Sequence, residues 1–294
     1  MENEDKHFLF QPLLPHFNPS SYEINQQNDY NNSKFFIPNN NNIIHRILLI
    51  LFVAIISIWA NYEASKTFDI HIVNDTKDSL AGRRFTLFYV SNDKASRILL
   101  NTSSFVEQIL YPNGNNDNID IKNKKIIKSV TLRLARQNLD TITTITADEK
   151  NINSYVIEIS PMLLEDENFN NMAIVGAIQR AMARVWLWDG RSKASPRLLD
   201  GMVEYIAELA GFHRERLSGG VGESPECEDG RELWWDNKDP THVARLLHYC
   251  EKYDKGFIQR LNEAMKDTWH DRMVGDVLGL KATKLCGLYN ATYL

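Results

Sequence analysis

The spacing of apolar residues changes several times along the chain, and each spacing predicts a different kind of element. Alternation with period two predicts strands, because successive side chains of a strand point to opposite faces. Apolar residues three and four positions apart predict helices. On this basis we expect strands over residues 68–73, 129–135 and 154–160, and a helix over residues 95–111.

From residue 169 onward the pattern is helical. Proline is favoured at the first position of a helix, where its missing N–H would have no partner. Pro196 and Pro240 therefore mark two helix starts, and shorter helices fit residues 256–269 and 271–279. Strands followed by helices predict an α+β fold.

A long apolar run lies near the N-terminus. Residues 47–60 are all apolar or small, and His45 and Arg46 before them have side chains that can reach lipid headgroups. A membrane-spanning helix needs about 20 residues, so we expect one transmembrane signal-anchor helix over residues 43–62. A cleaved signal peptide and a buried helix of a globular protein are the alternatives.

The residues before this run are polar and rich in asparagine. Residues 1–42 cannot bury enough apolar surface to offset the entropy of ordering, so we predict a disordered tail. Lys34 and Arg46 precede the run, and the positive-inside rule therefore predicts a cytosolic tail and a lumenal or extracellular ectodomain over residues 63–294. The chain is thus expected to be a single-pass type II protein of the secretory pathway or plasma membrane, held in the lipid bilayer by residues 43–62.

Asn-X-Ser/Thr sequons on the expected ectodomain agree with an exported location. They predict glycosylation at Asn74, Asn101 and Asn290.

The net charge and the cysteine content limit the partners and the disulfide bonds that the chain is expected to have. The net charge is −5 and the pI is about 5.9, so no broad basic surface indicates a nucleic-acid partner. The three cysteines contain no CxxC pair and allow at most one internal disulfide, while buried free thiols fit equally well. They are Cys227, Cys250 and Cys286.

The segment AIVGAIQRAMARVWLWDG, residues 173–190, is apolar around the whole helix except for two arginines one turn apart. A helix that is apolar on every side is buried, so Arg180 and Arg184 need charged partners or a polar cleft. The next helix places Asp200 and Glu204 four residues apart and hence on one face. We expect these four side chains to form an ion-pair set; a phosphate or carboxylate ligand in a cleft, or solvent, are the alternatives.

Five segments together resemble a known family. RAMARVWLWDG, LLDGMVEYIAELAG, WWDNKDPTHVARLLHYC, GFIQRLNEAM and VLGLKATKLCGLY are similar to the metallopeptidase core of the plant basic secretory protein (basic secretory protease) family. That family reads approximately HExxHVWQW-N-G in the first segment and EGxADY in the second, and the resemblance spans about residues 67–294. It implies a zincin-like metallopeptidase fold with an N-terminal mixed sheet and a C-terminal helical part, a zinc cofactor and a link to plant defence. It also places the edge strand before the zinc helix at IEISPMLL, residues 157–164.

The family's site residues fall on positions that have changed. The two zinc histidines correspond to Arg180 and Arg184, the general-base glutamate to Ala181 and the acidic ligand to Asp200. A guanidinium has no lone pair to give a metal, and a methyl group cannot act as a base. We therefore predict no metal site and a catalytically inactive peptidase homologue, which binds a peptide or protein in the former active-site cleft beside the 154–160 strand.

An active peptidase with a rearranged site, dependent on zinc or not, is the alternative function. The ectodomain retains five histidines, none of which has HxxxH spacing to another: His71, His213, His242, His248 and His270.

Overall fold

The structure described here is a computed structural model. It describes residues 40–64, 68–112, 124–148, 151–165, 170–213, 239–281, 284–285 and 287. The chain divides into two units, Met1–Ile58 and Trp59–Leu294, which are described separately.

The predicted anchor coincides with helix α1, Asn40–Ala64. Its large apolar side chains are exposed, to 65% at Leu49 and 71% at Ile58. Within the part of the chain that the structure describes, however, no helix combines the length and apolar character needed to cross a membrane. The prediction of a transmembrane helix over residues 43–62 therefore gains no support from the structure, and residues 1–39 of the predicted tail lie outside the described residues.

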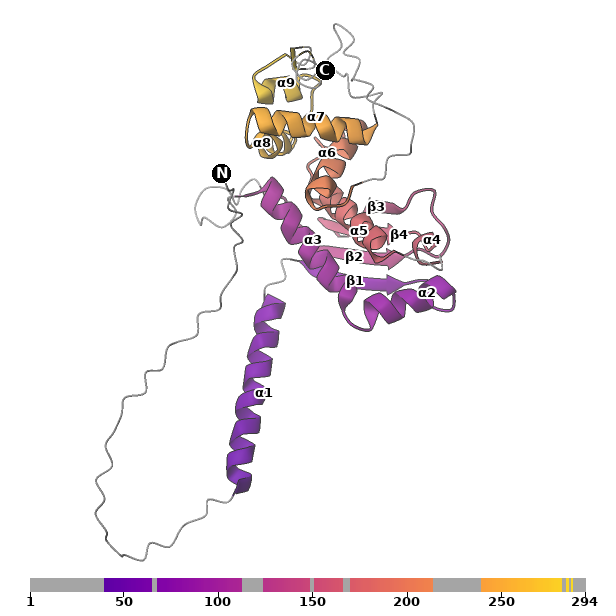
Figure 1. Ribbon diagram of the computed structural model, residues 1–294, viewed down its shortest axis with the longest axis vertical. Helices are drawn as coiled ribbons and strands as arrows, with labels where there is room; N and C mark the ends of the chain where they lie inside the picture. The colour runs from indigo at the N-terminus through magenta and orange to yellow at the C-terminus, as the bar shows by residue number, and fades with distance from the viewer. Residues whose placement is uncertain are drawn as a thin grey trace, which may run out of the picture. The chain divides into compact units, whose positions relative to one another are not determined.

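A four-stranded mixed sheet organises the second unit (Figure 1). The strand order is β1-β2-β4-β3; β1, β2 and β4 are parallel, whereas β3 is antiparallel to β4. The strands are β1 (Asp69–Asn74), β2 (Ser129–Leu134), β3 (Thr143–Ala147) and β4 (Ser154–Ile159). Three of them confirm the predicted strands, and β3 was not predicted because threonine occupies most of its positions.

β3 is one of the two edge strands of the sheet, with β1 at the other edge, and the expectation that residues 157–164 supply the edge strand is wrong. β4 pairs with β2 on one side and with β3 on the other. Strand order depends on pairing between segments far apart in sequence, and the alternation within each strand carries no information about it.

The two faces of the sheet differ in polarity, as the register shows. Leu132, Ile157 and Ile145 share one face, and Arg133 and Glu158 share the other, where Arg133 Nη1 lies 3.2 Å from Glu158 Oε1. Helices α3 (Lys94–Leu110) and α5 (Asn171–Trp186) pack against each other and lie across the sheet (Figure 1). The α+β class predicted from the pattern is confirmed.

Helices make up the C-terminal part, as predicted. Both prolines stand at the first position of a helix, α6 (Pro196–Leu209) and α7 (Pro240–Tyr253). These helices pack closely at Gly201, where an added Cβ would lie 2.3 Å from Val243 Cγ1. The shorter helices are α8 (Phe257–Ala264) and α9 (Met273–Leu278); the short α2 (Leu80–Phe85), η1 (Thr86–Val90) and α4 (Met162–Glu165) were not predicted.

Candidate functional site

Helix α5 carries both arginines in its last turns. The helix begins after Asn170, whose side chain accepts a hydrogen bond from the Met172 N–H at 2.8 Å. After the helix, Gly190 adopts a φ of +61°, and a Cβ at this position would lie 2.7 Å from Trp269 Cβ. Only glycine fits such a close approach at positive φ, so the turn after α5 is fixed by the packing of the C-terminal part.

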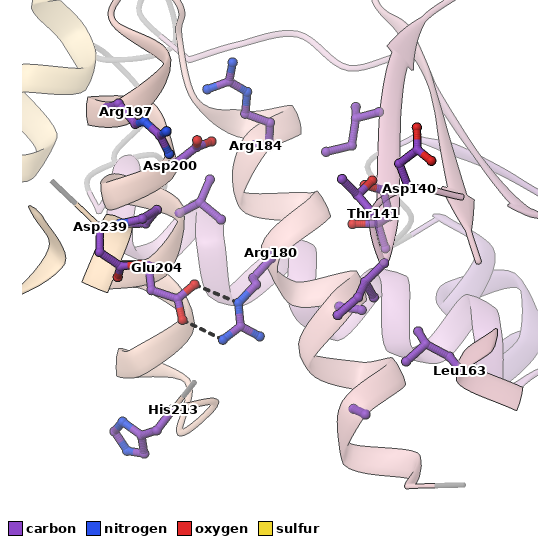
Figure 2. Close-up of a pocket in the computed structure, with 17 residues that line it drawn as sticks. Asp140, Thr141, Leu163, Arg180, Arg184, Arg197, Asp200, Glu204, His213 and Asp239 are labelled. Carbon is purple, nitrogen blue, oxygen red and sulfur yellow. Dashed lines mark hydrogen bonds and ion pairs between the residues drawn. The ribbon is translucent and has the colours of Figure 1, made fainter. Parts of the chain in front are cut away.

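Arg180 forms a two-point ion pair with Glu204 of α6 (Figure 2). The Nε donates to Glu204 Oε2 at 2.8 Å and the Nη2 to Oε1 at 2.7 Å. The same Nη2 donates to the Phe212 carbonyl at 2.9 Å, and Nη1 donates to the Gly176 carbonyl at 3.3 Å. Glu204 is only 2% exposed, so this pair neutralises a buried carboxylate.

Arg184 lies one turn further along α5, and its surroundings differ from those of Arg180. Its Nη1 is buried and has no hydrogen-bond partner among the described residues. Asp200, the other carboxylate of the predicted set, is exposed on α6. Of the four predicted side chains, the structure therefore brings Arg180 and Glu204 together and leaves Arg184 and Asp200 without an ion pair between them.

A cavity of about 800 Å³ lies beside these helices. Its walls come from α5, α6, β3 and the segment before β3, as Figure 2 shows. The charged residues that line it are Asp140, Arg180, Arg184, Arg197, Asp200, Glu204, His213 and Asp239. Thr141, Ile142 and Ile145 form part of the wall opposite the arginines. The cavity is large enough for several residues of a peptide.

The outer edge of β3 offers backbone groups at this cavity. The Ser160 N–H donates to the Ile142 carbonyl at 3.0 Å, and the Asp148 N–H donates to the Ser154 carbonyl at 2.8 Å. Backbone groups of an antiparallel strand alternate in direction, so those of Ile145 point away from β4. Among the described residues no strand pairs with β3 on that side.

A half-buried lysine lies near the end of α5. Lys125 Nζ donates to the Leu187 carbonyl at 2.8 Å and lies 5.1 Å from the ring centroid of Tyr155 and 5.4 Å from that of Trp188. Burial lowers the pKa of Lys125 to about 8; the Arg184 charge lowers it further, while Asp189 opposes the shift.

The donor set at this point of α5 does not fit a metal ion. Arg180 and Arg184 provide no lone pair, and Ala181, 1% exposed, provides only a methyl group. In the described ranges no group of three or more His, Cys, Asp or Glu side chains is placed to hold a metal. Zinc chemistry therefore cannot be derived from these residues.

The predicted glycosylation sites have different surroundings. The amide nitrogen of Asn74 donates to the Gly82 carbonyl at 2.8 Å and to Thr86 Oγ1 at 3.0 Å. Asn101 is exposed on α3, and Asn290 lies outside the described residues.

Of the cysteines, Cys250 is a buried free thiol. Burial raises its pKa to about 12. Cys227 and Cys286 lie outside the described residues.

Sequence reasoning missed β3 and Lys125. The segment TITTITA consists of threonine and isoleucine except for its last residue, and such a run of β-branched residues is a usable strand signal. Nothing in the sequence around Lys125 indicates that its side chain is half-buried and close to two aromatic rings.

Comparison with known proteins gives one match. The family model BSP, described as peptidase of plants and bacteria, matches residues 65–289. No curated protein and no solved structure matches the chain significantly.

Proposed function

Because residues 65–289 match the BSP model, the chain belongs to this family of peptidases of plants and bacteria, and we propose that it is a catalytically inactive member that binds a peptide between β3 and α5. By the resemblance, its fold is proposed to be zincin-like. A mixed sheet whose edge strand is antiparallel to its neighbour and precedes α5 agrees with that proposal.

The chemistry of α5 carries the proposal that catalysis is lost. The two positions that correspond to zinc histidines hold permanent cations, and one of these cations is already bound to Glu204 at two points. The position of the general base holds alanine. A peptidase of this type needs two imidazoles, a third ligand and a carboxylate beside the metal-bound water.

The open edge of β3 supports peptide binding. An extended peptide can add to an exposed sheet edge through main-chain hydrogen bonds, while neighbouring pockets select its side chains. Ile145 directs its N–H and carbonyl to the free side of β3, and its side chain lines the cavity. The cleft is thus proposed beside β3, and not beside the 154–160 strand.

Zinc content and turnover test the loss of catalysis. We expect the purified full-length chain to hold well under one zinc per chain after incubation with zinc and dialysis, and to release no products from a mixture of random hexapeptides. A relative that keeps both histidines and the glutamate is the positive control. Stoichiometric zinc with chelator-sensitive turnover would establish the alternative of an active metallopeptidase, and chelator-insensitive turnover would establish a different hydrolase.

Peptide binding is tested at Ile145. We expect affinity-selection mass spectrometry to retain a subset of C-amidated hexapeptides on the wild-type chain. Ile145→Pro removes an outward N–H but no bond between β3 and β4, so it should weaken retention about tenfold. Ile145→Val keeps the N–H and most of the side chain, and should retain the same peptides with similar affinity. Equal retention by all three proteins would place the peptide elsewhere.

A membrane anchor over residues 43–62 and a lumenal or extracellular ectodomain are proposed on the sequence alone. The apolar run of residues 47–60 and the charges before it support the topology. Protease protection of residues 63–294 in sealed microsomes tests it, since digestion from the cytosolic side would exclude the type II orientation. A role in plant defence is proposed on the family resemblance only.

A further inference from the structure

Arg184 is the charged side chain of the cavity whose hydrogen bonding is incomplete. Its Nη1 is buried without a hydrogen-bond partner among the described residues. A buried charged donor without a partner is costly, and the other arginine of α5 does not share this condition. Arg180 donates to Glu204, Phe212 and Gly176.

The position of Arg184 makes a ligand its available partner. The side chain belongs to the cavity lining, and Figure 2 draws no interaction between it and the other lining residues. Three of the lining carboxylates, on Asp140, Asp200 and Asp239, are exposed to solvent. A ligand that enters between β3 and α5 would therefore occupy a cavity that Arg184 lines.

We propose that Arg184 binds a carboxylate group of the peptide that occupies this cavity. This inference rests on the proposed peptide-binding function and names the chemistry that the peptide must carry. The planar guanidinium fork matches a carboxylate at two points. Four carboxylates also line the cavity, including Glu204, and their repulsion disfavours a dianion such as phosphate relative to a monoanionic carboxylate.

The test compares acids with amides on the full-length chain. Isothermal titration calorimetry measures the affinity of a retained hexapeptide as the C-terminal acid, as the C-terminal amide, and as an amide with one internal glutamate. We expect the wild-type chain to bind at least one carboxylate form about tenfold or more tightly than the neutral amide. Preference for the acid identifies the chain terminus as the source of the carboxylate, and preference for the glutamate peptide identifies a side chain.

Variants test whether the preference for a carboxylate over an amide depends on Arg184. Arg184→Gln should abolish it without lowering the melting temperature, because the replaced Nη1 makes no hydrogen bond within the described structure. Arg83→Gln makes the same change at an exposed arginine that does not line the cavity and should keep the preference. If Arg184→Gln unfolds, Arg184→Lys keeps the charge and loses the two-point geometry, and should reduce the preference. Equal binding of acid and amide, or a preference that survives in both Arg184 variants, would overturn the inference.

Failure of this inference is distinguishable from failure of the proposed function. N-acetyl-alanine and its amide serve as probes too short to add to the edge of β3. Arg184-dependent binding of N-acetyl-alanine, with no gain from a longer peptide, would support the carboxylate site and reject the peptide cleft. Peptides that bind equally as acids and amides would support the cleft and reject the carboxylate site, and no binding by any probe would reject both.

Discussion

Arg180 and Glu204 meet at two points, with donor–acceptor distances of 2.8 and 2.7 Å, across the interface of α5 and α6. Glu204 is 2% exposed and the Arg180 side chain 22% exposed. A carboxylate so far from solvent needs this partner, so Arg180 has a structural role at the interface of the two helices.

Arg180→Met should therefore lower the free energy of unfolding by about 3–5 kcal/mol, because it leaves Glu204 charged and buried. Urea denaturation measures the change. The double variant Arg180→Met, Glu204→Leu removes both charges and should recover most of the lost unfolding free energy. Arg191→Met is the control, because it breaks an ion pair at the surface: the Arg191 side chain is 71% exposed and that of its partner Asp267 is 63% exposed. We expect this variant to change the free energy of unfolding by about 1 kcal/mol or less. Similar losses of unfolding free energy for Arg180→Met and Arg191→Met would contradict the structural role of Arg180.

The indole of Trp186 provides a second stability prediction. Its Nε1 donates to Ser103 Oγ at 2.8 Å, and both residues are buried. Ser103→Ala leaves the indole N–H without a partner and should cost about 1–3 kcal/mol of unfolding free energy. Ser104→Ala, at an exposed position of the same helix, should cost well under about 1 kcal/mol. Thermal denaturation of the two variants side by side decides whether the hydrogen bond is the cause.

The close contact between α6 and α7 predicts that replacing a helical glycine with alanine lowers stability, which is the reverse of the usual effect. Alanine normally stabilises a helix interior by about 1 kcal/mol relative to glycine. At Gly201, however, the new Cβ would lie 2.3 and 2.5 Å from atoms of Val243. Overpacking of this kind costs about 1–3 kcal/mol, so we expect Gly201→Ala to be destabilising on balance. Val243→Ala should reduce the penalty in a double-mutant cycle, and additive effects would show that the clash is relieved elsewhere.

Lys125 predicts a pH-dependent stability difference. Its folded-state pKa of about 8 lies below its ordinary value of 10.5. Between these values the folded chain binds fewer protons than the unfolded chain, so its unfolding free energy rises with pH, by at most about 1.4 kcal/mol per pH unit. The difference between wild type and Lys125→Met should therefore shift in favour of wild type from pH 8 to 10, as urea denaturation at each pH would show.

Cys250, whose pKa burial raises to about 12, is present in both of these proteins, so its contribution cancels from the difference. Lys128→Met changes an exposed lysine nearby and should leave the pH profile parallel to that of wild type. A parallel profile for Lys125→Met as well would mean that the lysine has an ordinary pKa in the folded chain.

The sequence by itself determined most of the local elements and pointed to the family. Apolar spacing gave β1, β2, β4 and the long helices, since each period reflects the geometry of a single segment. Prolines placed two helix starts for the same local reason. The motif resemblance pointed to the family that the comparison then showed, and the spacing of Arg180 and Arg184 put both guanidiniums on one face of α5.

Only the tertiary structure decided which of these side chains meet. Asp200 and Glu204 lie four residues apart on one face of α6, so their spacing does not say which of them meets an arginine. The packing of α5 against α6 puts Glu204 opposite Arg180 and leaves Asp200 exposed. The edge position of β3 and the partial burial of Lys125 likewise depend on contacts between distant segments. Such contacts are set by how the whole core closes, and no window of the sequence contains them.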